Sequence, residues 1–262
     1  MSLYGEGLTV RLGATMVIKD VSFSAAAGQV TAIVGPNGSG KTTLLRALTG
    51  EVPATGKVWL NGRETSSQRG WEIAAQRAVL PQATSLAFPF TVIEVVRMGL
   101  VSGSGAAHQD LPQRALAVVG LAGYENRFFQ ELSGGEQQRA QLARVLVQVW
   151  DPVGPDGPRW LLLDEPVSSL DIGHQIEVMD LMRSYAGRGG GVVAVMHDLN
   201  LTAMAADMAV VMDNGRVLAK GAVDTVLTDD VLQRAYKCRL RVNSMPRNGG
   251  LFVLPQSAGD AA

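Results

Sequence analysis

The sequence predicts an α/β fold, and three apolar runs carry that prediction. Residues 29–34 form a short run rich in β-branched side chains that ends in a glycine-rich turn, and residues 42–48 then show helical spacing. Two later runs, residues 160–163 and 192–196, each end in a cluster of polar residues. Parallel strands deliver side chains to the carboxyl edge of a sheet in this way, so we expect a parallel sheet at the core.

The size and charge of the chain limit its function. Its 262 residues give room for one large domain or two small ones. Lys and Arg number 23 against 24 for Asp and Glu, so the sequence has no overall basic surplus of the kind that dominates nucleic-acid binding. We therefore expect no nucleic-acid partner, although this count leaves a local basic patch open.

The sequence also predicts the compartment. No apolar run reaches the about 20 residues that a membrane span needs, and residues 1–7 lack the charged and apolar regions of a signal peptide. The single Cys238 fits a reducing compartment and is expected to be a small apolar filler. We expect a cytoplasmic protein, so any membrane role must come through a partner.

A mainly helical segment lies between the early and the late strands. Three stretches in it favour helix, residues 91–98, 113–119 and 136–149. We expect them to form a helical subdomain, about residues 88–150, inserted between strands of the sheet. Gly103, Gly105, Ala106 and Ala107 mark a loop inside it, and residues 151–158, rich in Pro and Gly, predict a loop that leads back to the sheet.

Residues 35–43 predict a phosphate-binding loop between a strand and a helix. Two glycines separated by four residues are followed by Lys41 and Thr42. Backbone amides of such a loop wrap phosphate oxygens, Lys41 brings a charge to the β- and γ-phosphates, and the Thr42 hydroxyl can ligate Mg²⁺. A plain turn that caps a helix does not need Lys and Thr at that offset. The expected phosphate-binding residues are Gly35, Pro36, Asn37, Gly38, Ser39, Gly40, Lys41, Thr42 and Thr43.

Two carboxylates follow the apolar run 160–163. Asp164 at a strand end can hold a metal ion, usually through water, and Glu165 can polarise the water that attacks a γ-phosphate. Two adjacent acids alone are not specific, because they also occur in solvated turns. The phosphate-binding loop upstream favours the catalytic interpretation.

A second anion-binding helix start is predicted at Ser133, Gly134, Gly135 and Glu136. Ser133 and Glu136 form a capping box that opens a helix. The box does not explain the two glycines, which leave the amides at the helix start sterically open to an anion. Two such helix starts in one chain imply two bound nucleotides, or one nucleotide shared between two chains.

The order of these motifs resembles the ATP-binding cassette (ABC) ATPase family over about residues 8–225. The resemblance implies a P-loop NTPase core with a mixed sheet, an N-terminal antiparallel β part and the inserted helical subdomain. It also implies that residues 1–262 form one nucleotide-binding domain with a C-terminal tail from about residue 226. ATP and Mg²⁺ are the implied cofactors.

The same resemblance implies roles for further residues. Leu132 to Glu136 match the family signature, with Glu136 where many members carry Gln, and Asp171 matches the D-loop. Gln82 is expected at the metal with Thr42 and Asp164. Two chains are expected to sandwich two ATP molecules head to tail, with the phosphate loop of one facing the signature of the other.

Glu165 and His197 are the expected catalytic residues, His197 matching the switch histidine of the family. His197 directly follows the run 192–196, so its imidazole is expected at the sheet edge where Asp164 and Glu165 emerge. A lone His is more often a structural residue, and Gln82 has the alternative of being an ordinary loop glutamine. One position departs from the family: Leu12 stands where an aromatic usually stacks on adenine, which puts base selectivity in doubt unless Tyr4 or another aromatic reaches over.

Within the family, residues 88–99 look like the corresponding stretch of the ATPases of importers that take up iron chelates, haem and cobalamin. Residues 151–158, together with residues 197–201, are similar to bacterial haem-importer ATPases in particular. This likeness implies a homodimer that drives haem import through two copies of a separate permease, supplied by a periplasmic haem-binding protein, at the cytoplasmic face of the inner membrane. The alternatives are a ferric siderophore or cobalamin as cargo, a soluble non-transport ABC ATPase, or a nucleotide-dependent scaffold. Residues 88–99 could also serve only the packing of the helical subdomain.

Overall fold

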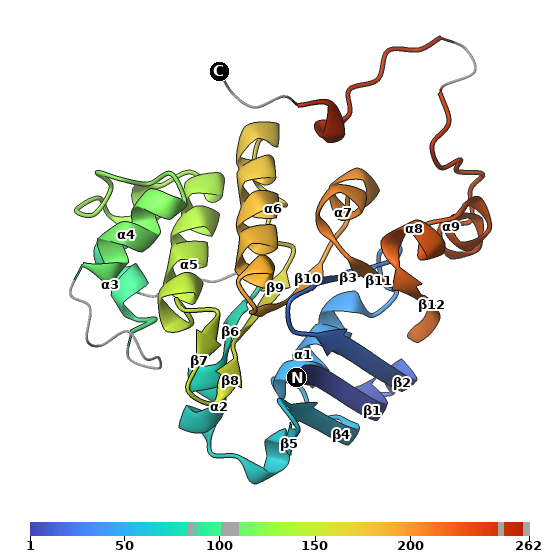
Figure 1. Cartoon of the computed structure of the whole chain (residues 1–262), viewed down its shortest axis with the longest axis horizontal. Coiled ribbons are helices and arrows are strands. Elements are labelled where there is room, and N and C mark those ends of the chain that lie inside the picture. Colours follow the sequence, from blue (N-terminus) through green and yellow to red (C-terminus); the bar gives the residue numbers. More distant parts are fainter. Residues whose placement is uncertain (83–85, 87, 101–109, 246–248, 259–262) are drawn as a thin grey trace.

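A computed structural model describes residues 1–82, 86, 88–100, 110–245 and 249–258 of the chain. The loop expected at Gly103 to Ala107 lies outside the described residues. The arrangement in Figure 1 includes two main sheets with a helix between them, a small two-stranded sheet and a group of helices to one side. In the described part of the chain, no helix is long and apolar enough to cross a membrane.

The central sheet has six strands in the order β12-β11-β3-β10-β9-β6. Its inner strands pair in parallel, and β12 pairs antiparallel with β11. Every residue of β3, β9 and β10 is buried, which explains why their sequences are continuous apolar runs instead of alternating patterns. The strands are β3 (Val30–Val34), β6 (Arg77–Leu80), β9 (Trp160–Asp164), β10 (Gly191–Val195), β11 (Met208–Asp213) and β12 (Arg216–Ala222).

A second, antiparallel sheet is built mainly by the N-terminal segment. Its order is β2-β1-β4-β5, and all its pairings are antiparallel. The strands are β1 (Ser2–Leu12), β2 (Thr15–Ala26), β4 (Thr55–Leu60) and β5 (Arg63–Glu64). The expected mixed sheet with an N-terminal antiparallel part is confirmed.

Helix α1 (Lys41–Thr49) lies between the two sheets, where it positions the end of the phosphate-binding loop. Its buried Leu44 and Leu48 pack in one cluster with Leu3 of the antiparallel sheet and Ile33 of the central sheet. On the other face of the central sheet, α6 (Ile172–Gly187) and α7 (Leu199–Ala205) contribute to the second apolar cluster. The site-bearing strand ends are therefore held by apolar layers on both sides.

Three helices to one side of the central sheet fall within residues 88–150 (Figure 1). They are α3 (Val92–Arg97), α4 (Leu111–Val118) and α5 (Gly134–Gln148), close to the three predicted stretches. Helix α5 packs against both of the others and against β6, so it joins this helical group to the central sheet.

The remaining elements are short. They are α2 (Gly70–Gln76), α8 (Val223–Val226), α9 (Asp229–Tyr236), a two-stranded sheet of β7 (Val153–Gly154) and β8 (Gly157–Pro158), and 3₁₀ turns at Thr65–Ser67, Phe129–Glu131 and Pro255–Ser257.

Two sequence predictions need correction. Residues 151–158 are not only a loop, because β7 and β8 form a tight hairpin in which Gly157 takes a φ of 111°. Cys238 is not a core filler: it is exposed, because it follows the left-handed turn at Lys237 that ends α9. Pro155, Asp156 and Gly157 are a local turn signal for the hairpin, whereas the exposure of Cys238 depends on how the end of α9 packs.

Candidate functional site

The phosphate-binding loop leads from β3 to α1, as predicted. Gly35 has a φ of 147°, and a Cβ there would lie 2.3 Å from the Met212 carbonyl oxygen, so only glycine fits. Gly40 caps α1 with a φ of 102°. These conformations direct the backbone of the loop around the start of α1, which is the arrangement that binds phosphate.

Lys41 is buried at the start of α1, with its ammonium inside the loop. Its Nζ donates to the carbonyl oxygens of Gly35 at 2.9 Å and Pro36 at 3.1 Å. Burial lowers the pKa of Lys41, and the nearby charges of Glu165 and Asp164 act in the opposite direction. The loop therefore holds a cation within reach of two carboxylates.

Thr42 and Asp164 come together from α1 and the end of β9. The Thr42 Oγ1 hydroxyl donates to Asp164 Oδ1 at 2.9 Å, and Asp164 is only 3% exposed. Burial raises the pKa of Asp164. These are hard oxygen donors of the kind that Mg²⁺ prefers, and Mg²⁺ is commonly held by one or two carboxylates together with phosphate oxygens and water. Among the described residues, no three His, Cys, Asp or Glu side chains gather as a metal site of their own, so the donor set fits a cation bound along with a phosphate.

Glu165 is the centre of a second cluster. His197 Nε2 lies 2.6 Å from Glu165 Oε1, and the Gln82 amide donates to the same oxygen at 3.0 Å. The Glu165 side chain is 14% exposed and that of His197 42% exposed, so the cluster opens to solvent on the His197 side. Glu165 has a φ of 53°, a left-handed conformation that a side-chain-bearing residue keeps only when its surroundings hold it.

Three neighbouring strands bring this cluster together. Glu165 follows β9, His197 lies two residues after β10 and Gln82 two residues after β6. Because β10, β9 and β6 are adjacent and parallel, their carboxyl ends meet at one edge of the sheet. The placement of His197 beside Glu165 is as expected, and Gln82 joins them through the same carboxylate oxygen. The chemical roles of these residues stay predictions.

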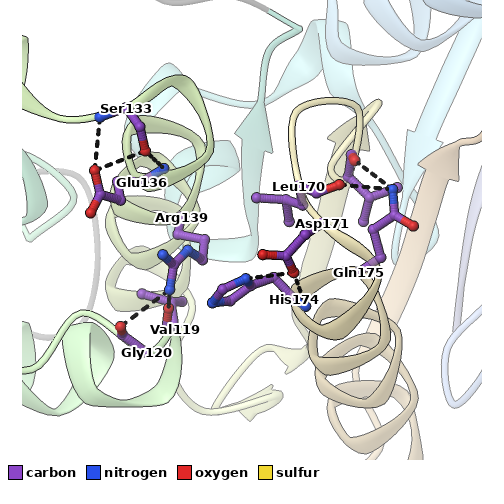
Figure 2. A network of polar contacts seen from close by, with 10 residues as sticks. Val119, Gly120, Ser133, Glu136, Arg139, Leu170, Asp171, His174 and Gln175 are labelled. Carbon is purple, nitrogen blue, oxygen red and sulfur yellow. Dashed lines mark hydrogen bonds and ion pairs between the residues drawn. The ribbon is translucent and has the colours of Figure 1, made fainter. Parts of the chain in front are cut away.

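Helix α5 begins with the predicted capping box. The Ser133 amide and hydroxyl both donate to Glu136 Oε2 at 2.8 Å, and the Ser133 oxygen accepts from the Glu136 amide at 3.3 Å (Figure 2). These bonds from Ser133 lower the pKa of the exposed Glu136 carboxyl. The two glycines differ: a Cβ on Gly134 would meet nothing within 4 Å, but one on Gly135 would lie 2.9 Å from the Ser169 carbonyl oxygen. Only Gly134 is open as predicted, and Gly135 allows close packing.

An open cavity of about 420 Å³ lies between α5 and α6, lined mainly by polar groups. Asp171 caps α6 from its wall, accepting from the His174 amide at 3.0 Å, and its Oδ1 lies 2.8 Å from His174 Nδ1 (Figure 2). Arg139 faces them from α5 and donates to the carbonyl oxygens of Val119 and Gly120. Ser133 to Glu136 of the predicted signature and Asp171 therefore line the same cavity. The residues of the phosphate-binding loop do not line it. The lining residues are Ser133, Gly134, Gly135, Glu136, Arg139, Ser169, Leu170, Asp171 and His174.

A comparison with protein families shows that residues 18–168 match the ABC transporter family. The chain belongs to the ABC transporter family. The enzyme class expected from the sequence, an ATPase coupled to transport, is confirmed for this cassette. Nucleotide binding follows from the same membership.

Curated relatives of this ABC cassette are similar over almost their whole lengths. A protein of Jannaschia sp. (strain CCS1) named Hemin import ATP-binding protein HmuV is 60% identical, over 97% of this chain and 94% of that protein. A protein of the same name from Rhizobium meliloti (strain 1021) is 56% identical, over 96% of this chain and 97% of that protein.

Solved structures agree on the fold. The ADP conformation of an ATP-binding cassette of an ABC transporter superposes with a TM-score of 0.74 at 23% identity, over 90% of this chain and 99% of that chain. A dimeric bacterial ABC transporter cassette gives a TM-score of 0.72 at 24% identity, over 84% of this chain and 98% of that chain. At these identities the likeness supports the fold alone, and the predicted α/β P-loop fold is confirmed.

Residue 12 is the position where the family resemblance predicts adenine stacking, and it is not aromatic. Leu12, at the end of β1, is 49% exposed. Tyr4 lies nearer the other end of β1, with its ring centroid 5.4 Å from that of Trp59, so it pairs with that ring. Position 12 therefore carries an exposed aliphatic side chain.

Sequence reasoning missed one residue of the site, Gln138. Its Nε2 donates to the Glu165 carbonyl oxygen at 2.8 Å, and its Oε1 accepts from the Ser169 amide at 3.1 Å. The available signal was its position two residues after Glu136 on the predicted helix. A polar residue on a helix usually faces solvent, so this signal alone does not point to a contact with Glu165.

Proposed function

We propose that this chain is the ATP-hydrolysing subunit of an importer that takes up haem across the inner membrane of a bacterium through a separate permease. The observation that carries the haem assignment is the 54 to 60% identity, over nearly the whole chain, to curated hemin import ATP-binding proteins. A ferric siderophore or cobalamin is the alternative cargo, because none of the residues described above selects the transported compound.

The chemistry of hydrolysis is assigned to the two clusters at the sheet edge. Lys41 and the amides of residues 35–43 bind the β- and γ-phosphates. Glu165 orients and polarises the attacking water, and His197 holds the Glu165 carboxylate and contacts the γ-phosphate. Mg²⁺, when bound by oxygens of Thr42, Asp164 and Gln82, neutralises charge on the phosphates.

We assign the second half of the nucleotide site to a partner copy. Ser133 to Glu136 and Asp171 line a cavity that the phosphate-binding loop of the same chain does not reach. A head-to-tail homodimer, in which these residues meet ATP held by residues 35–43 of the other chain, gives both groups a ligand. In this proposal residues 1–262 form one nucleotide-binding domain, with a helical subdomain at about 88–150 and a C-terminal tail at about 226–262.

Exposed aromatic side chains at Phe88 and Phe128 support a permease contact. Phe88 is 67% exposed and Phe128 45% exposed, and the Gln130 amide ties the two segments together by donating to the Phe88 carbonyl oxygen at 2.8 Å. Exposed aromatic side chains of this kind are enriched where proteins meet. We propose that two copies of a permease subunit bind here, that a periplasmic haem-binding protein delivers the cargo, and that the complex works at the cytoplasmic face of the inner membrane without a nucleic-acid partner.

The test measures the ATPase activity of the chain reconstituted in liposomes with its permease, with and without haem-loaded binding protein. Stimulation by the haem-loaded protein together with haem accumulation is the expected result. Stimulation only by a ferric siderophore or cobalamin would replace the cargo and keep the importer. ATPase activity that never responds to the permease would favour a soluble ATPase.

A further inference from the structure

The loop that carries Glu165 is held by side chains from two helices. Gln175 of α6 donates to the Val167 carbonyl oxygen at 3.3 Å and the Leu170 carbonyl oxygen at 3.1 Å. Between β9 and α6, residues 165–171 contain both the proposed catalytic Glu165 and Asp171 of the cavity. Gln138 of α5 bonds to this loop at two points, the Glu165 carbonyl oxygen and the Ser169 amide. A single amide group therefore spans the loop from its first residue to its fifth.

The bonds from Gln138 support an unfavourable backbone conformation at Glu165. Glu165 is in the left-handed region, with a φ of 53°, a conformation that is unfavourable for a residue with a side chain. Within the loop, the Glu165 carbonyl oxygen accepts a long bond from the Ser168 amide at 3.4 Å, while the bond from Gln138 is 2.8 Å. The bond from Gln138 is the shorter of the two and therefore the stronger support for this peptide group.

The packing around Gln138 leaves the loop little freedom to move away. Gly135, one turn earlier on α5, lies so close to Ser169 that a Cβ would be 2.9 Å from the Ser169 carbonyl oxygen. On the opposite side, the Glu165 amide donates to the Val195 carbonyl oxygen at 3.2 Å. Residues 165–169 therefore lie between the first turns of α5 and the end of β10.

We propose that Gln138 is a positioning residue for ATP hydrolysis, which clamps residues 165–169 onto α5 and thereby aims the Glu165 carboxylate at His197 and Gln82. The inference rests on the proposed role of Glu165. It gives α5 two tasks, because its first residues line the cavity and Gln138 holds the catalytic loop of the same chain. Gln138 touches no reacting atom, so its effect is on the rate of the chemical step and not on nucleotide binding.

The test uses substitutions of nearly equal volume. Gln138→Glu can still accept from the Ser169 amide, but it cannot donate to the Glu165 carbonyl oxygen and places a negative oxygen against it. Gln138→Met removes both bonds without adding charge. The matched controls are Gln148→Glu and Gln148→Met, because Gln148 lies on the same helix and donates to the carbonyl oxygens of Ala74 at 2.9 Å and Arg77 at 3.0 Å, away from the loop.

Four quantities are measured on the full-length chain with its permease: kcat, KM, the Kd for ATP and Tm. Misplacement of a reacting group by about 1 Å can cost on the order of a hundredfold in rate, so we expect kcat to fall about tenfold to a hundredfold in the Gln138 variants, with the Kd for ATP unchanged. The Gln148 variants are expected to lower Tm and keep kcat. A Gln138 variant that loses no more kcat than its Gln148 counterpart overturns the inference.

Glu165→Gln separates this result from a failure of the proposed function. If Glu165→Gln hydrolyses ATP at the wild-type rate, the catalytic role of Glu165 is wrong and the inference falls with it. If Glu165→Gln is inactive while the Gln138 variants match their controls, only the positioning role is wrong. Should both Gln138 variants fail to fold, Gln138→Asn, whose shorter amide loses its reach without adding charge, is judged by the same split between kcat and Kd.

Discussion

His197 Nε2 and Glu165 Oε1 lie 2.6 Å apart, and the Gln82 amide shares the same carboxylate oxygen at 3.0 Å. The three side chains come from the ends of three adjacent strands. This contact fixes the direction of the Glu165 carboxylate from two sides, which is what a general base needs before substrate arrives.

Glu165→Gln is expected to leave ATP binding intact and to trap the nucleotide-bound dimer. The amide keeps the size of the side chain but loses the charge that polarises water, and loss of a general base costs typically 10²–10⁴-fold in rate. Hydrolysis is measured as phosphate release, and dimer formation by size-exclusion chromatography with ATP. Wild-type turnover in this variant would refute the assignment.

Lys41→Ala is expected to lose most of the ATP affinity. The buried ammonium is the cation of the phosphate-binding loop, and a hydrogen bond to a charged group is worth about 1.5–3 kcal/mol, or roughly tenfold to a hundredfold in Kd. The measurement is ATP binding by calorimetry. Lys57→Ala is the control, since Lys57 is exposed and pairs only with Glu64 at 3.4 Å in the described structure. Equal affinity of the two variants would contradict the loop assignment.

Glu136→Gln is expected to lower the ATP concentration needed for half-maximal hydrolysis. The capping box survives, because an amide oxygen can also accept from Ser133, but the carboxylate charge beside the Ser133 hydroxyl is removed. Like charges about 4 Å apart in water cost about 1 kcal/mol, so a roughly fivefold change is expected. The control is Glu72→Gln, in the capping box of α2, where Glu72 accepts from the Arg69 amide at 2.7 Å. A higher KM in Glu136→Gln alone would mean that the carboxylate itself contacts the nucleotide.

Leu12→Tyr is expected to tighten ATP binding. An aromatic ring at this exposed position supplies the stacking surface that Leu12 lacks, and stacking of a base on an aromatic side chain is worth about 1–3 kcal/mol. Calorimetry measures the Kd for ATP in the wild type and the variant. An unchanged ATP affinity would place the adenine away from residue 12.

Asp164→Asn is expected to raise Tm at neutral pH even though it impairs hydrolysis. Burial raises the pKa of Asp164 above its ordinary value of 3.8, so the folded protein binds this proton more tightly than the unfolded chain does. The wild type therefore loses stability as pH rises through the folded pKa, and the variant does not. Thermal melts over a pH series should show that the difference in Tm between the variant and the wild type becomes smaller as pH falls toward 3.8. Asp180→Asn, at an exposed position on α6, is the control.

Much of the site follows from local sequence. Short motifs fix the chain path around a phosphate, as at Gly35 and Gly40, whose positive φ angles match the glycine spacing. The capping box at Ser133 was equally predictable, because its two partners are three residues apart. The strand ends of Glu165 and His197 could be expected to meet, since both followed apolar runs typical of a parallel sheet.

The sequence by itself determined the α/β class, the nucleotide-binding motifs and the resemblance to ABC cassettes, because these depend on residues close together in the chain. Only the tertiary structure decided that Gln138 bonds to residues 165 and 169, that Gly135 makes room for Ser169, and that Cys238 is exposed. Each of these depends on how α5 or α9 packs against segments distant in sequence. Such contacts are set by the relative position of whole elements, which no local pattern of side chains encodes.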